Sequence, residues 1–158
     1  MVRDTVRVYL RNTSSPYSIV DSAKSVLDST GYGTFYFPNA VNGTLYYIVI
    51  KHRNSIETWS KQGKMFTSYQ LSYDFITAAN KAYGDNLILK GIRYCIYSGD
   101  VNQDGSIDLS DIINVYNDVT NFVTGYVATD VTGNGVVDLN DLIIAFNNSN
   151  AFVSIIRP

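Results

Sequence analysis

Several segments in the first two thirds of the chain alternate between hydrophobic and polar positions, which is the pattern of half-buried β-strands. In residues 5–11, Val6, Val8 and Leu10 share one face, and polar or aromatic residues occupy the other. Residues 45–52, with the sequence LYYIVIKH, are rich in β-branched and aromatic side chains. Both segments are therefore predicted to be strands.

Three further segments extend this β pattern. Phe35 and Phe37 alternate around Tyr36, and residues 88–97 have the composition of a last strand. Residues 18–29 could form a helix or a strand, and a strand or irregular structure is favoured because the surrounding pattern is all β. Short strands at this spacing predict a β-sandwich over residues 1–97.

The last third of the chain has a different pattern, a repeat with a period of thirty residues. The segment DVNQDGSIDLSD at 100–111 recurs as DVTGNGVVDLND at 130–141, and the apolar positions after each copy align as well. A repeat at a fixed period indicates one structural unit built twice. Each copy is expected to be a loop followed by one helix, which makes residues 98–158 a small α domain.

Each repeated loop has the spacing of a calcium-binding loop of the EF-hand type. Such a loop supplies oxygens from positions 1, 3, 5, 7, 9 and 12, with glycine at position 6 where the chain turns sharply. Position 7 contributes its backbone carbonyl, so its side chain can vary. The predicted ligands of two Ca²⁺ ions are Asp100, Asn102, Asp104, Ser106, Asp108 and Asp111 in the first loop and Asp130, Thr132, Asn134, Val136, Asp138 and Asp141 in the second.

Other positions of the two loops add detail to this prediction. Gly105 and Gly135 stand at position 6. Ile107 and Val137 stand at position 8, where we expect them to point into the core and to join the two loops by a short backbone bridge. Position 12 is Asp rather than Glu, so the following helix must lie closer to the ion. The second loop has one carboxylate fewer and is predicted to bind calcium more weakly.

Paired loops that end in Asp and are each followed by one helix resemble the dockerin family, the calcium-folded module that docks onto cohesin domains. The resemblance covers about residues 98–152 and implies calcium binding and attachment to a protein receptor. After position 9, however, this chain has Leu-Ser and Leu-Asn instead of the Ser-Thr type of pair. The candidate partner-binding residues at these positions are Leu109, Ser110, Leu139 and Asn140.

The first part of the chain has a resemblance of its own. The string GTFYFPNAVNGTLYYIVIKHRN, with a glycine before each aromatic strand, is similar to prealbumin-like domains of the carboxypeptidase regulatory-like type. The match spans about residues 3–97. A β-sandwich joined directly to a dockerin-like repeat resembles the C-terminal end of large secreted bacterial surface proteins.

Charge is distributed unevenly along the chain. Residues 1–97 contain eleven basic and six acidic residues, a net charge of +5, whereas residues 98–158 contain one basic and eight acidic residues, a net charge of −7. Two Ca²⁺ ions would bring the second part to −3, which would remove much of its self-repulsion. The basic residues of the first part are too few and too scattered for a nucleic-acid-binding surface.

The sequence also bears on location. No apolar run approaches the ~20 residues needed to span a bilayer, and MVRDTVRVYLRN lacks the features of a signal peptide. Cys95 is the single cysteine, so calcium would take the stabilising role of disulfides. We expect an extracellular or cell-surface bacterial module, present here as a C-terminal fragment of a larger secreted protein.

Residues that could indicate other functions have simpler interpretations. His52 is the only histidine and lies in a strand pattern without a catalytic motif around it, so no enzyme activity is predicted. Trp59 could stack on a sugar ring, but a place in the core is the commoner role. Tyrosines at 9, 36, 46 and 47 could form an adhesive face. The Phe-Val pairs at 122–123 and 152–153 are expected to pack in the core.

The sequence therefore predicts a non-catalytic, calcium-binding extracellular module that mediates protein attachment or assembly. Its partner would be a cohesin-like receptor or further copies of the same chain, and no nucleic acid. Two alternatives remain open at this point. One is a self-assembling subunit of an extracellular filament or surface layer, and the other is a carbohydrate-binding module stabilised by calcium.

Overall fold

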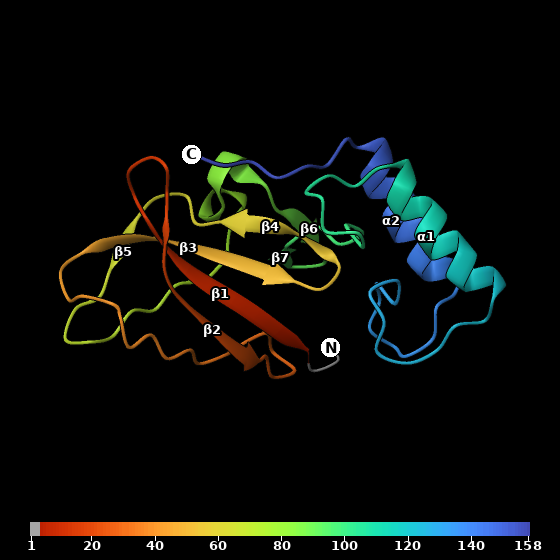
Figure 1. Ribbon diagram of the computed structural model, residues 1–158. Helices are drawn as coiled ribbons and strands as arrows, with labels where there is room; N and C mark the ends of the chain where they lie inside the picture. The colour runs from red at the N-terminus through yellow and green to blue at the C-terminus, as the bar shows by residue number, and fades with distance from the viewer. Residues whose placement is uncertain (1–3) are drawn as a thin grey trace.

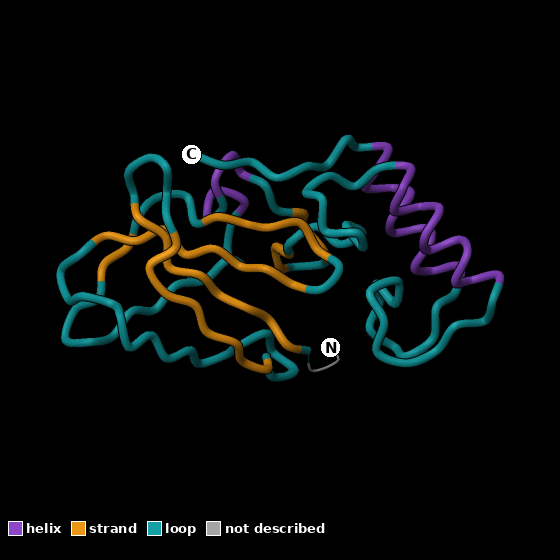
Figure 2. Tube along the Cα trace, in the orientation of Figure 1, coloured by secondary structure: helices purple, strands orange, loops and turns teal. Residues whose placement is uncertain are grey.

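The computed structural model describes residues 4–158 and contains a β part followed by a pair of helices (Figure 1). Residues 1–3, with which the predicted β domain begins, lie outside the described part. The helices pack side by side at one end of the molecule, and long loops connect the strands (Figure 2). The strands are β1 (Thr5–Asn12), β2 (Ile19–Val26), β3 (Leu45–His52), β4 (Ser55–Trp59), β5 (Lys64–Met65), β6 (Ile88–Lys90) and β7 (Arg93–Cys95).

The main sheet is antiparallel, with the strand order β2-β1-β3-β4 and with β5 also paired to β3. Val8 lies opposite Ile50 and Leu10 opposite Ile48, so the apolar residues of β1 and β3 meet on one face. This register follows from the side-chain period of two, because a slip of one residue would turn both apolar sets towards water. The predicted strands at 5–11 and 45–52 are confirmed, and the ambiguous segment at 18–29 contains β2.

Loops cover the apolar face of the sheet. Val8, Leu10, Tyr46 and Ile48 form its buried core, and partly buried side chains from the connecting segments pack against them. The predicted strand at residues 35–37 is wrong, since the chain there is irregular. The alternation nevertheless predicts burial correctly. The rings of Phe35 and Phe37 stack with their centroids 6.5 Å apart and pack against the core, whereas Tyr36 is 83% exposed.

The last predicted strand also differs from expectation. Residues 88–97 form a hairpin of two short strands, β6 and β7, and not one continuous strand. The hairpin turns at Gly91, whose φ of 62° suits a residue without a side chain. Two short 3₁₀ turns, η1 (Ala79–Lys81) and η2 (Tyr83–Asp85), precede it. Gly91 is a sequence signal of this break, since a glycine inside a strand pattern commonly marks an irregularity.

The two helices are α1 (Leu109–Thr120) and α2 (Leu139–Asn150), each twelve residues long. Each begins with a capping box between loop positions 9 and 12, formed by Asp108 with Asp111 and by Asp138 with Asp141. A capping box satisfies backbone N–H groups that have no partner within the helix. The last turn of each calcium-type loop is therefore also the first turn of a helix. None of the helices within residues 4–158 is long and apolar enough to cross a membrane.

The loops interlock in a way that the sequence did not predict. Ile107 and Val137 do point into the core, with 2% and 3% exposure, but they do not bridge to each other. Ile107 donates its N–H to the carbonyl of Val153, and Val137 donates to that of Val123. Each loop thus pairs with the segment that follows the helix of the other repeat. Neither repeat completes its hydrogen bonding alone.

In each Phe-Val pair that ends a repeat, the valine is packed and the phenylalanine is exposed. Val123 and Val153 pack into hydrophobic clusters, as expected. Phe122 and Phe152 do not: they are 85% and 90% exposed. Both have left-handed backbone conformations, with φ of 54° and 52°. The predicted core role is therefore wrong for both phenylalanines, because the chain reverses at these residues and turns their side chains outward.

One hydrophobic cluster joins the sheet to the helical part. Ile56 of β4 is fully buried against Ile107 of the first loop and Val153 of the last segment. Tyr97 and Ile155 pack around them. The helical part thus packs directly on the edge strand of the sheet, which covers an edge that would otherwise be exposed.

Candidate functional site

Asp100, at position 1 of the first loop, has a buried carboxylate with one oxygen that no described residue partners. Asp100 is 2% exposed, and its Oδ1 has no hydrogen-bond partner among residues 4–158. Burial, together with the negative charges of Asp111 and Asp104, raises the pKa of Asp100 to about 6. A buried oxygen of this kind carries a free-energy cost unless a cation or a donor is supplied.

Asp111, at position 12, closes this loop. Its carboxylate is fully buried and accepts N–H groups from Val101 at 2.8 Å, Asn102 at 3.1 Å and Asp108 at 3.0 Å. Burial nevertheless raises its pKa, although these hydrogen bonds oppose the change. The Asp111 side chain therefore binds the backbone at both the beginning and the end of the loop.

The rim of the first loop is polar and exposed. Asn102 Oδ1 accepts the N–H of Asp104 at 2.9 Å, and Asp104 Oδ1 accepts that of Ser106 at 3.0 Å. Asp108 accepts both the hydroxyl and the N–H of Ser110, and these bonds lower its pKa. The remaining predicted ligands thus lie along the rim, held by hydrogen bonds within the loop.

The second loop has the same outline but is internally satisfied. Asp130 is also 2% exposed, yet its two oxygens accept N–H groups from Gly133 at 2.9 Å, Asn134 at 3.1 Å and Gly135 at 2.9 Å. Asp141 accepts the N–H of Thr132 at 2.7 Å and that of Asp138 at 2.8 Å. Here backbone N–H groups of the loop itself partner both oxygens of the leading carboxylate.

Position 6 behaves as expected in both loops. Gly105 and Gly135 have φ of 98° and 86°, a conformation in which any side chain would be strained. The carbonyls of Ser106 and Val136, at position 7, and the side chains of Thr132 and Asn134 remain as the neutral oxygens of the predicted sets.

The donor chemistry fits calcium, although the carboxylates do not form a tight cluster. Within residues 4–158, no three acidic, histidine or cysteine side chains converge as a metal-binding group. Asp100 nevertheless lies near enough to Asp104 and Asp111 for their charges to raise its pKa. Calcium loops also use amide, hydroxyl, carbonyl and water oxygens, so a tight cluster of carboxylates is not required. The unpartnered Asp100 oxygen gives the first loop the better fit.

A second candidate site is an apolar groove between the helices. It has a volume of about 290 Å³ and is open to solvent on the outer side of α1 and α2. Several lining residues are half exposed or more, including Tyr116 at 54% and Phe146 at 50%. The lining consists of Ile112, Ile113, Tyr116, Leu139, Leu142, Ile143 and Phe146.

The groove differs from the partner surface predicted from sequence. Leu139 lines it, and Leu109 is 66% exposed at the start of α1. Ser110 and Asn140 instead take part in the hydrogen bonding of the helix caps. The missed residues lie one and two turns further along each helix. Their signal was present in the sequence, since the apolar positions after the two loops align at the thirty-residue period.

Other side chains considered from sequence lie away from both sites. Trp59 is 2% exposed and donates its indole N–H to Glu57 at 2.8 Å, in agreement with a core role. Tyr46 is 3% exposed and lies on the packed face of the sheet, whereas Tyr9 and Tyr47 point to the opposite face. The four tyrosines therefore form no common adhesive face.

Comparison with known proteins supports the architecture. No protein-family model and no curated protein matches the chain. A solved structure that does match is a type II cohesin–X-dockerin complex from Acetivibrio cellulolyticus, in an N-terminal interface mutant. The alignment covers 95% of this chain and 85% of that one, with a TM-score of 0.53 and 18% identity.

At the level of the fold, the chain is similar to the X-module–dockerin arrangement named for that structure, with an antiparallel sheet part followed by the helices α1 and α2. The expected β part followed by a dockerin-like pair of helices is therefore confirmed at the level of the fold.

Proposed function

We propose that this chain is a non-catalytic, calcium-binding attachment module that presents its helical face to a cohesin-like receptor. The observation that carries the proposal is the apolar groove between α1 and α2. Its residues come from equivalent positions of the two repeats, and both helices leave them open to solvent. Contiguous apolar patches are rare on soluble monomers and commonly mark interaction sites.

The architecture supports a protein partner. The matching solved structure is a cohesin–X-dockerin complex, so an arrangement of this kind is found there together with a cohesin. In the present chain the groove is lined by branched aliphatic and aromatic side chains without a charged residue among them. Such a surface suits burial against another protein better than contact with a sugar, which requires polar groups around an exposed aromatic ring.

Calcium has a structural role in this proposal. The ligands of the first ion are the oxygens of Asp100 to Asp111, and those of the second are the oxygens of Asp130 to Asp141, at the loop positions named above. When bound, each ion supplies positive charge to a region whose net charge is −7. We place the boundary between the two domains at residues 97 and 98. The setting is extracellular, where free calcium is abundant enough for sites of modest affinity.

Binding to immobilised type II cohesin domains tests the proposal. The parent chain should bind in the presence of calcium and lose binding when a chelator is added. The double variant Ile113→Glu with Ile143→Glu places a charge in each half of the groove and should abolish binding. Ile92→Glu is the matched control, because Ile92 is 94% exposed on the β6–β7 turn and should tolerate the charge.

The outcomes separate the remaining functions. Loss of binding in both the double variant and the control would contradict a role for the groove. No binding by the parent chain to any cohesin, together with reversible growth in light scattering under calcium, would favour a self-assembling subunit. That alternative has a specific basis here, since a second copy could cover the same apolar groove.

A further inference from the structure

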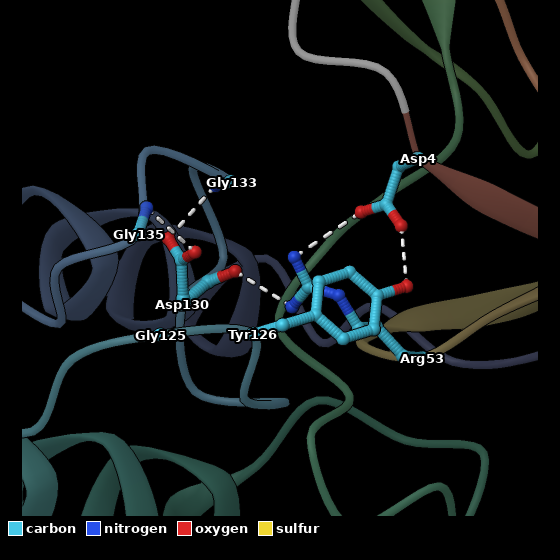
Figure 3. Close-up of a pocket in the computed structure, with 7 residues that line it drawn as sticks. All are labelled: Asp4, Arg53, Gly125, Tyr126, Asp130, Gly133 and Gly135. Atoms are coloured by element: carbon cyan, nitrogen blue, oxygen red, sulfur yellow. Dashed lines mark hydrogen bonds and ion pairs between the residues drawn. The ribbon is translucent and has the colours of Figure 1, made fainter.

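The turn between β3 and β4 reaches from the sheet to the second calcium-type loop. Figure 3 shows Arg53 of this turn between Asp4, at the start of β1, and Asp130, at the start of the loop. Tyr126 lies over the guanidinium, and glycines of the loop complete the surroundings. These residues line a cavity of about 190 Å³ between the two parts of the molecule.

Arg53 binds backbone atoms at the start of the second loop and in the segment just before it. Its Nη1 donates to the carbonyl of Asp130 at 2.9 Å and to that of Val127. Asn54 Nδ2 donates to the same Asp130 carbonyl, also at 2.9 Å. Two side chains of the β3–β4 turn therefore hold the backbone carbonyl of the leading residue of the second loop.

The guanidinium is itself held in place. Its Nη2 lies 3.1 Å from Asp4 Oδ2, and its centre lies 4.4 Å from the centroid of the Tyr126 ring. Tyr126 donates its hydroxyl to the other oxygen of Asp4. The arginine side chain is only 15% exposed, and the planar fork of an arginine loses little freedom when it binds several acceptors.

Among residues 4–158, no charged side chain gives the first loop equivalent support. The carbonyl of Asp100 accepts a hydrogen bond from Gln103, which belongs to the same loop, at 2.7 Å. Gln103 also donates to Ser55 of the sheet at 3.2 Å. In the first repeat, the neutral side chain of Gln103 binds the carbonyl of the leading Asp. In the second repeat, the ion-paired Arg53 of the β3–β4 turn binds the corresponding carbonyl.

We propose that Arg53 is a positioning residue for the second calcium site, so that the sheet presets this loop for the ion. This inference rests on the proposed calcium binding and adds to it a dependence of one loop on the X-module-like part. The second loop has fewer carboxylates and gains affinity because its leading residue is already placed. Asp4 balances the charge of Arg53, which would otherwise repel Ca²⁺.

The test is calcium titration by calorimetry on the full chain, with each site observed alone. Asp104→Ala disables the first loop, and Asn134→Ala disables the second. In the Asp104→Ala background, Arg53→Gln should weaken calcium binding tenfold or more, because two charge-assisted hydrogen bonds are lost, one to the first residue of the loop and one to the segment just before it. Arg53→Lys should weaken it nearly as much, since lysine keeps the charge but cannot bind both carbonyls and Asp4 together.

Controls make the result specific. In the Asn134→Ala background, Arg53→Gln should change the affinity of the first loop less than twofold. Arg7→Gln, in β1 and outside the contacts described for Arg53, should leave the calcium affinity of both loops unchanged. Near-ultraviolet circular dichroism at saturating calcium checks that the variants fold, and Asp4→Asn provides a milder variant expected to weaken the second site two- to fivefold.

Three outcomes would overturn the inference. An unchanged affinity at the second loop would show that Arg53 only joins the two parts, and a tighter affinity would show that its charge repels the ion. An equal loss at both loops would indicate general loosening. A parent chain that binds no calcium at all would overturn the calcium assignment itself, and this result is distinguishable because it appears before any substitution at Arg53.

Discussion

The two calcium-type loops follow one sequence template, yet they treat their leading carboxylates differently. In the first, Asp100 is buried with an oxygen that has no partner among the described residues, and its pKa is raised to about 6. In the second, Asp130 is equally buried but accepts three backbone N–H groups from its own loop. Similar loop sequences therefore leave one buried carboxylate oxygen without a partner and surround the other carboxylate with backbone donors.

This difference affects how each loop would gain from calcium. The first loop would gain mostly from relief of repulsion among Asp100, Asp104 and Asp111. The second loop would gain less free energy from relief of charge repulsion, but it would also lose less conformational entropy on binding because its backbone is already ordered. The sequence-based prediction that the second loop binds more weakly stays a prediction, and it depends on which of these two contributions is larger.

The largest expected effect is on stability, and it comes from replacing the position-12 carboxylates, Asp111 in the first loop and Asp141 in the second. Asp111→Ala removes the acceptor of three N–H groups and should lower the free energy of unfolding by roughly 3–5 kcal/mol. Asp141→Ala removes the acceptor of two and should cost about 2–3 kcal/mol. Urea denaturation of the calcium-free chain, followed by circular dichroism, measures both. Equal losses would contradict the view that the first loop depends more on its position 12.

Replacing the position-1 carboxylates, Asp100 and Asp130, should change the stability by a smaller amount and in opposite directions. Without calcium, Asp100→Asn removes a buried charge and should raise the free energy of unfolding by about 1–2 kcal/mol. Asp130→Asn replaces one of the two acceptor oxygens that the loop uses with an NH₂ donor, and should lower the free energy of unfolding by about 1–3 kcal/mol. The same denaturation experiment applies, and two changes of the same sign would refute the comparison.

The pH dependence of the calcium-free chain should come mainly from the first loop. The pKa of Asp100 is about 6 in the folded chain, against about 4 in an unfolded chain. Stability should therefore rise as the pH falls from 6 towards 4, by about 1 kcal/mol between pH 7 and pH 5. The raised pKa of Asp111 acts in the same direction. Thermal unfolding in chelator at the two pH values measures this, and Asp100→Asn should remove most of it.

The smallest expected effect concerns a feature that the repeats share. Phe122 and Phe152 are exposed and left-handed, a conformation that asparagine tolerates better than phenylalanine. Phe122→Asn and Phe152→Asn should each stabilise the chain by about 0.5–1 kcal/mol. A loss of stability in either variant would mean that its ring makes a contact worth more than the strain. Differential scanning calorimetry can resolve changes of this size.

Much of the architecture followed from local patterns. The strands at 5–11 and 45–52 and the helices after each loop were predicted because their periodicities are long and regular. Short segments were less reliable. Phe35 and Phe37 alternate like a strand but pack from an irregular loop, since alternation reports which side chains are buried and does not require a neighbouring strand.

The amino-acid sequence by itself determined the repeat, the loop positions of the predicted oxygen ligands and the glycine turns, because these depend on spacing within twelve residues. Only the tertiary structure decided how the repeats complete each other. Ile107 pairs with Val153 and not with Val137, and Arg53 holds a loop more than seventy residues away. Such contacts join distant segments whose approach depends on the packing of the whole chain, and no local pattern encodes them.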